Sequence, residues 1–162
     1  MLTAFSHRRA GAWTGTAFDF AVLDHSERHV RRKLIRLIHE GEVLVDFPGA
    51  VSLENGDALE LDDGRLVEVI AAEEELYEVT AHSAGELAAL CWHIGNRHLE
   101  AQIEESRILI LRDHVILAML EGLGAHLREV NEPFHPQRGA YSGQGHSHEH
   151  GHEHRPAAAA AH

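Results

Sequence analysis

Short runs in which apolar and polar residues alternate fill the first half of the chain, and such runs are typical of half-buried strands. One strand is predicted over residues 18–23 and another over residues 42–47, where Pro48-Gly49 is expected to end it. Residues 31–38 fit either a strand or a helix, because their apolar positions agree with both periodicities. The pattern therefore predicts strands and leaves one segment undecided.

Turn signals separate these runs at close intervals. Asp62-Asp63-Gly64 lies between the apolar residues of 58–61 and 65–70, an arrangement that predicts a tight hairpin. Short strands at such spacing indicate a small all-β domain. The acidic run Glu73-Glu74-Glu75 marks a change of pattern, so this domain is predicted to span residues 1–75.

The second half of the chain alternates between strand and helix patterns. Residues 76–81 predict a strand, after which Ser83 and Glu86 form a capping box at the start of a helix. Gly95-Asn96 is expected to end that helix, with Asn96 as its left-handed residue. One face of the helix is apolar and consists of Leu87, Leu90, Cys91 and Ile94.

A second unit of the same kind follows. Residues 103–111 predict a strand, Asp113 can cap a second helix, and residues 126–130 predict a final strand. The apolar face of the second helix consists of Val115, Ile116, Met119, Leu120 and Leu123. The order β-α-β-α-β, with one strand open to division into two, predicts a ferredoxin-like split-βαβ domain over residues 76–136. The predicted fold class is therefore α+β.

The C-terminal stretch has a different composition. Residues 137–162 are dominated by Gly, Ser, Gln, His and Ala, so we expect them to be disordered. Within this tail every second residue is a histidine over the segment that contains His146, His148, His150, His152 and His154. Imidazole is a common metal ligand, and this spacing predicts a polydentate trap for Ni²⁺, Zn²⁺ or Cu²⁺. The alternative is a solvated end whose metal binding is incidental.

Charge and composition limit the kinds of ligand and the cellular location that we expect for this protein. The chain has 162 residues, a formal net charge of −12 and 16 histidines, which disfavours binding to nucleic acid and favours cations. Its one cysteine, Cys91, excludes an intrachain disulfide and is expected to be a small core residue. The sequence contains neither a long apolar run nor a signal-peptide core, so we expect a soluble, cytoplasmic protein without a membrane partner.

Two histidines outside the tail are candidate metal ligands. His98 follows the predicted helix end, where a side chain is presented at the surface. His114 would stand in the first turn of the second helix, next to the capping residue Asp113. Each could equally be a surface histidine with no ligand role. His93, at the edge of the apolar stripe, is expected to be partly buried and hydrogen-bonded.

Signatures of catalysis are missing from the sequence. It has no Gly-x-Ser-x-Gly motif, no His-Glu-x-x-His motif, no Walker loop and no dinucleotide fingerprint. We therefore expect a protein that is not an enzyme.

Several motifs in combination resemble the urease accessory proteins of the nickel metallochaperone type (UreE). They are His93-Ile94-Gly95-Asn96-Arg97-His98, Arg112-Asp113-His114-Val115, Pro133-Phe134, and Gly139-Ala140-Tyr141 before a His-rich end. The first half is similar too, at Asn55-Gly56-Asp57 and Asp63-Gly64-Arg65. The resemblance covers nearly the whole chain and depends on the combination, because each motif alone is weak.

The resemblance implies a function and a set of partners. The protein would be a homodimer whose second domain carries the dimer interface, and His98 from both chains would bind one metal at the two-fold axis. It would deliver Ni²⁺ to apo-urease together with accessory proteins that include a GTPase, while its first domain contacts partners. The tail would supply further imidazoles. Zn²⁺ and Cu²⁺ would also bind, because affinity for imidazole sites follows the Irving–Williams order.

Two departures from the family pattern affect these expectations. Some relatives have a His-Asp-His block where this chain has Arg112-Asp113-His114, and a positive charge at Arg112 disfavours a secondary cation site. The turn Phe47-Pro48-Gly49-Ala50 replaces a basic version and alters the expected partner surface. Two other readings stay open: a metal store that uses the tail alone, and a metal-dependent hydrolase that uses His98, His114 and an acid.

Overall fold

The computed structural model describes residues 1–39 and 41–139. The strands of the first sheet are β1 (Leu2–Arg8), β2 (Asp19–Leu23), β3 (His29–Arg36), β4 (Glu42–Ser52), β5 (Ala58–Leu61) and β6 (Leu66–Ala71). The second region comprises β7 (Glu73–Thr80), α1 (Ala84–Asn96), β8 (Ala101–Ile103), β9 (Ile108–Leu111), α2 (His114–Gly122) and β10 (His126–Pro133).

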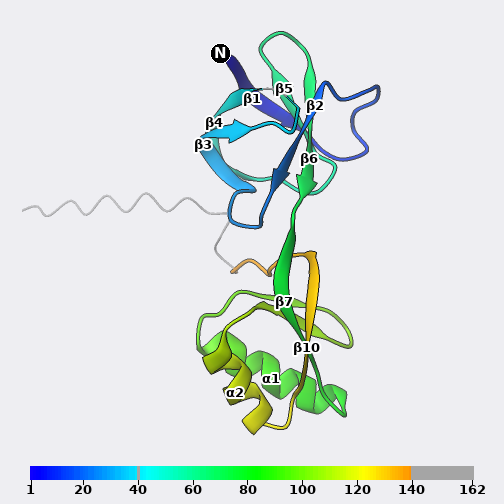
Figure 1. Ribbon diagram of the computed structural model, residues 1–162, viewed down its shortest axis with the longest axis vertical. Coiled ribbons are helices and arrows are strands. Elements are labelled where there is room, and N and C mark those ends of the chain that lie inside the picture. The colour runs from blue at the N-terminus through cyan, green and yellow to red at the C-terminus, as the bar shows by residue number, and fades with distance from the viewer. Residues whose placement is uncertain (40, 140–162) are drawn as a thin grey trace, which may run out of the picture.

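The first sheet is curled, and its strand order is β2-β6-β5-β1-β4-β3 (Figure 1). Strand β1 pairs with β4 in parallel and β2 pairs with β6 in parallel, whereas the other pairs are antiparallel. Alternate residues point inward and form one apolar core, to which β6 contributes Val67 and Val69, both fully buried. The prediction of an all-β first region is therefore confirmed.

Individual elements of this sheet confirm some predictions and correct another. Strands β5 and β6 form the predicted hairpin, and Gly64 takes a φ of 85° in its turn, a conformation that favours glycine. The undecided segment at residues 31–38 belongs largely to strand β3, at the edge of the sheet. Strand β1 was not predicted, because only Ala4 among its residues is buried and the apolar pattern is weak.

The expected end of β4 at Pro48 is wrong, since the strand continues to Ser52. The register of β3 against β4 shifts there: Val30 pairs with Val51, whereas Arg32 pairs with Asp46. Residues 47–50 therefore face a single residue of β3 and form an irregularity in the ladder. Proline is tolerated in this place because an irregular part of the ladder does not need the N–H that proline lacks.

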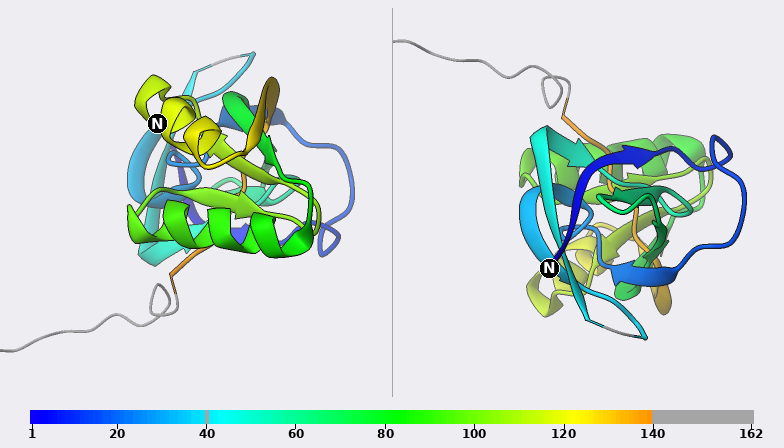
Figure 2. Two further views of the ribbon diagram at one scale, coloured as in Figure 1. Left: turned by 90° about the horizontal axis from the view of Figure 1, so that it is seen from below. Right: turned by 90° about the horizontal axis from the view of Figure 1, so that it is seen from above.

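The second region is a four-stranded antiparallel sheet with the order β10-β7-β9-β8. Both helices cover the same face of this sheet (Figure 2), which confirms the predicted ferredoxin-like arrangement and the α+β class. The single strand expected over residues 103–111 is divided into β8 and β9, because Glu104 and Arg107 close a turn between them. Strand β10 is longer than predicted and stays paired with β7 as far as Pro133.

The opposite face of the second sheet carries a small separate core of Leu76, Leu109 and Phe134, with Val130 packed against it. This face lies toward the first sheet, and the chain passes from β6 into β7 at the junction between the two regions (Figure 1). No helix within residues 1–39 and 41–139 is long and apolar enough to cross a membrane. The five tail histidines lie outside the described residues.

Candidate metal centre

His98 stands directly after the C-terminus of α1, in a conformation that few histidines adopt. The helix runs through Asn96 and is capped by Arg97, so the expectation that Asn96 is the left-handed residue is wrong. Instead His98 takes a φ of 55°, the only positive φ of a non-glycine residue in the part of the chain that the structure describes.

The hydrogen bonds around His98 explain why the chain turns there. The His98 N–H donates to the Gly95 carbonyl at 3.0 Å, and the Leu99 N–H donates to the Ile94 carbonyl at 3.3 Å. These two bonds form a Schellman motif, in which the left-handed position is usually glycine. Leu99 packs against the core of the second region and fixes the exit of the chain.

A histidine in this position has a cost and a consequence. The left-handed conformation disfavours an L-residue with a Cβ by about 1–2 kcal/mol. The same turn places the side chain outside the helix, and His98 is exposed to solvent. Backbone strain at an exposed imidazole is the kind of outlier that indicates a functional position.

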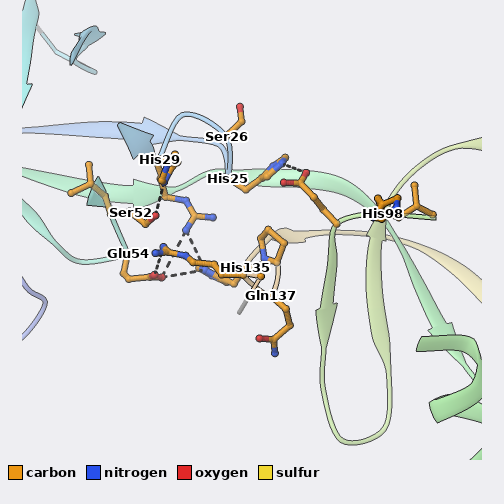
Figure 3. Close-up of a pocket in the computed structure, with 15 residues that line it drawn as sticks. His25, Ser26, His29, Ser52, Glu54, His98, His135 and Gln137 are labelled. Atoms are coloured by element: carbon orange, nitrogen blue, oxygen red, sulfur yellow. Dashed lines mark hydrogen bonds and ion pairs between the residues drawn. The ribbon is translucent and has the colours of Figure 1, made fainter. Parts of the chain in front are cut away.

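His98 lines an open groove between the two regions, with a volume of about 700 Å³. Figure 3 shows His98 at one end of this groove and His29, Ser52 and Glu54 at the other. His25 and His135 also line the groove, and so does Gly139, the last described residue. In the sequence, the His-rich segment follows a few residues after Gly139.

His25 is engaged at the junction and is not available as an open ligand. Its Nδ1 lies 2.6 Å from Glu74 Oε1 and its Nε2 lies 2.8 Å from Glu100 Oε2. Burial alone lowers the pKa of the His25 imidazole, but the hydrogen bonds to the two carboxylates outweigh burial and raise the pKa above its ordinary value. His25 therefore connects the turn after β2 to β7 and to the segment that follows His98.

Arg28 makes a second connection across the junction. Its guanidinium is buried, donates to the Phe134 carbonyl, and lies 3.2 Å from His135 Nδ1. Glu54 lies 4.0 Å from the same guanidinium, and Arg138 lies 3.6 Å from Glu54. The junction is therefore a set of paired charges around the C-terminal segment of the described chain.

His114 and its neighbours are arranged as the sequence suggests for a helix start. The carboxylate of Asp113 accepts from the N–H groups of Val115 and Ile116 at 2.8 and 3.1 Å, so it caps α2. The backbone N–H groups of Ile116 and Val115 lower the pKa of this carboxyl. His114 is the first residue of α2 and is exposed.

The Arg112 side chain is hydrogen-bonded to the backbone of the second sheet. Its guanidinium donates to the carbonyl oxygens of Leu76 and Val130 at 3.2 and 3.1 Å. Two carboxylates, Glu75 and Glu129, lie within 3.7 Å of it. The guanidinium is therefore occupied by β7 and β10.

Within residues 1–39 and 41–139, no group of three His, Cys, Asp or Glu side chains is close enough to hold a metal ion. Cys91 is half-buried against the core of the second region, and burial raises the pKa of its thiol, which disfavours the thiolate that metals bind. Any site at His98 must therefore draw ligands from a second chain, from the tail or from water.

The sequence analysis did not single out His25, His29 or His135, which line the same groove as His98. They come from segments that are far apart in the sequence, and only the packing of the two regions brings them together. The sequence around His25 gives no sign of its role, because its two carboxylate partners are distant in the sequence. Glu74 lies 49 residues away and Glu100 lies 75 residues away.

Comparison with known proteins covers both regions. Residues 6–72 match the family model described as the UreE urease accessory protein N-terminal domain, and residues 74–157 match the one described as its C-terminal domain. A urease accessory protein UreE of Mesorhizobium japonicum is 60% identical over 132 residues, which are 82% of this chain and 67% of that protein. The UreE of Agrobacterium fabrum is 52% identical over 145 residues, 90% of each chain.

A UreE of Brucella anthropi is 60% identical over 123 residues, 76% of this chain and 72% of the relative. The two family models together extend across most of the first sheet, the second sheet and the segment around His98. The chain therefore belongs to the UreE family of urease accessory proteins.

Proposed function

We propose that this protein is a nickel metallochaperone that delivers Ni²⁺ to apo-urease while the urease metallocentre is assembled. In this proposal it acts in the cytoplasm as a homodimer, together with urease accessory proteins that include a GTPase. Its family supports the role in urease maturation. The observation that carries the metal assignment is His98, an exposed imidazole held in a strained left-handed turn.

One imidazole per chain does not make a nickel site, so the site needs a partner. Two copies of His98 at a two-fold axis would supply two nitrogen ligands from one residue. The second region exposes large apolar side chains of the kind that cover one another in dimers, of which Trp92 is 64% exposed and Val115 is 62% exposed. These side chains support a dimer interface on the domain that carries His98.

The tail would add ligands to the site and enlarge its capacity. Gly139 and His98 line the same groove, and the tail histidines begin at His146, so the first of them is within reach of the groove along an extended chain. We assign His98 as the principal ligand, and His114 and the tail residues His146, His148, His150, His152 and His154 as further ligands. Imidazoles exchange metal readily, which suits delivery better than a closed thiolate site.

Activation of urease tests this proposal directly. Apo-urease is incubated with its accessory proteins, GTP and limiting Ni²⁺, and its activity is measured with this protein, with His98→Ala, or without either. We expect the unaltered protein to raise activation and His98→Ala to lose most of that effect. His93→Ala, in the last turns of α1 before His98, serves as the matched control and should behave like the unaltered protein.

Two outcomes would contradict the proposal. Activation that does not depend on the protein at all would exclude delivery. Activation that depends on the protein, is unchanged by His98→Ala and is lost when the tail histidines are replaced would assign the function to the tail alone, which is the storage alternative.

A further inference from the structure

Two histidines far from His98, His82 and His126, lie in contact through their ring nitrogens. His82 Nε2 lies 3.2 Å from His126 Nε2, and the two rings meet edge to face with their centroids 4.8 Å apart. His82 follows β7 and precedes the residue that caps α1, whereas His126 is the first residue of β10. The pairing of β7 with β10 brings these residues together although 44 positions separate them in the sequence.

The distance between the two nitrogens matches what a single metal ion requires. With metal–nitrogen bonds of about 2.05 Å, two imidazole nitrogens lie about 2.9 Å apart at a right angle and about 3.4 Å apart at the tetrahedral angle. The observed 3.2 Å lies between these limits. An ion at that bond length would therefore fit between His82 and His126 at an angle of about 103°.

The backbone on both sides holds the pair in place while the rings stay open to solvent. His126 pairs with Thr80 in the β7–β10 ladder, and the His82 N–H donates to Glu86 Oε2 at 3.1 Å. Both histidines are exposed, so a hydrated ion can reach the two Nε2 atoms. The Glu86 carboxylate adds negative charge beside the pair.

This pair is a separate place from the proposed centre at His98. His82 lies before the first turn of α1 and His98 lies after its last turn, and a helix of 13 residues is about 20 Å long. His126 and His114 are likewise separated by the length of α2. One ion cannot contact both sites in the same chain.

We propose that His82 and His126 chelate one divalent cation of the borderline class, such as Ni²⁺, Cu²⁺ or Zn²⁺, through their Nε2 atoms. Water fills the remaining positions, because the described residues offer no third His, Cys, Asp or Glu close enough to complete a group. A site with two protein ligands and several waters exchanges its ion quickly and binds less tightly than a closed site. The proposed site at His82 and His126 does not require that the protein delivers nickel to urease.

The competing account is that the two neutral rings form only a hydrogen bond with each other, in which one Nε2–H donates and the other Nε2 accepts. The two accounts differ in a measurable way. A hydrogen bond alone gives no saturable metal binding at this place, whereas a chelate requires both rings and fails when either is removed.

Cu²⁺ is the most sensitive probe, because imidazole sites bind it most tightly among the first-row divalent ions. The experiment uses the full-length chain with His98, His114 and the tail histidines replaced by Asn, and correct folding is checked by circular dichroism. Cu²⁺ is titrated by calorimetry, and the paramagnetic broadening of backbone amide signals is followed by NMR. We expect one equivalent per chain, with the amides next to His82 and His126 broadened first.

Single substitutions in this chain then decide the assignment. His82→Asn and His126→Asn should each weaken Cu²⁺ binding at least about tenfold, because a chelate needs both nitrogens. Arg128→Gln, an exposed neighbour on β10 without a metal ligand, should leave binding unchanged. Binding that is absent, or that survives either histidine substitution, would overturn the proposal.

A second comparison covers the case in which the heavily substituted chain does not fold. The otherwise unaltered protein and its His82→Asn variant are titrated side by side, and the variant should bind one equivalent of Cu²⁺ less per chain. Equal stoichiometries would also overturn the proposal.

Discussion

The junction histidine His25 and the exposed histidines His98 and His114 of the second region stand in opposite environments. In the first region His25 is held by Glu74 and Glu100, and His39 Nδ1 lies 2.8 Å from Asp19 Oδ1. In the second region His98 and His114 are exposed, and no side-chain hydrogen bond or ion pair engages them among the described residues. The imidazole ring of His25 is therefore held by two carboxylates, whereas the rings of His98 and His114 are open to solvent.

The number of ring nitrogens that are already engaged, and not histidine content, distinguishes these imidazoles as possible cation ligands. A carboxylate that accepts from one imidazole N–H leaves the other ring nitrogen open to a metal, whereas both ring nitrogens of His25 face carboxylates. A count of histidines along the sequence overlooks this distinction.

Among the substitutions considered, the replacement of Phe134 at the junction should lower the free energy of unfolding most. Phe134 is fully buried, packs with Leu76 and Leu109, and meets the His25 ring at 5.1 Å. Phe134→Ala leaves a cavity and should lower the free energy of unfolding by about 3–5 kcal/mol, measured by urea denaturation. Phe5→Ala, at a phenylalanine that is 58% exposed, is the control and should cost much less. Equal losses would contradict the account of the junction.

Replacement of His25 tests the pairing itself. His25→Gln should lower the free energy of unfolding by about 1–3 kcal/mol near pH 6, because it removes hydrogen bonds from two carboxylates. The pKa of His25 is raised in the folded state, so its contribution is fully present below the unfolded pKa and is lost as the pH rises through the folded pKa. The difference between the unaltered protein and His25→Gln should therefore be larger at pH 6 than at pH 9.

Glu100, one of the two carboxylates that bind His25, supplies the control. Glu100→Gln removes one of the two charges that raise the pKa of His25 and should reduce the same pH dependence. A difference between the unaltered protein and His25→Gln that is constant with pH, or larger at pH 9, would show that the charged pair does not stabilise the junction.

The smallest expected effect on stability is at His98, where it tests the strain of the left-handed backbone. His98→Gly and His98→Ala remove the same imidazole, but only glycine adopts the left-handed turn without strain, so the Gly variant should be more stable by about 1 kcal/mol in urea denaturation. The same two substitutions at His93, inside α1, should give the opposite order, because glycine is disfavoured in a helix. If His98→Ala were as stable as His98→Gly, the backbone at this position would not be strained.

Much of the fold could be predicted from local patterns, and the misses have physical reasons. The capping residues Ser83 and Asp113 act as predicted, since each accepts from an N–H of the first helical turn. Strand β1 and the continuation of β4 past Pro48 depend on pairing with distant strands, which no local pattern reports. Tertiary pairing overrides local signals in both cases.

The candidate site was predictable only in part. The position of His98 after a helix was expected from the sequence, but its left-handed backbone depends on the Schellman hydrogen bonds, and the sequence pattern assigned that role to Asn96. The contact of His82 with His126 depends on the register of β7 against β10, so sequence spacing gives no hint of it.

The most direct test of the account is nickel stoichiometry at His98. The full-length protein with its tail histidines replaced is titrated with Ni²⁺ by calorimetry, with metal analysis, and compared with the same protein carrying His98→Ala. The account predicts one tight Ni²⁺ per two chains and its loss in the His98→Ala variant, with weaker binding at His82 and His126 retained. Tight binding that is unchanged by His98→Ala, or that is absent from both proteins, would contradict the account.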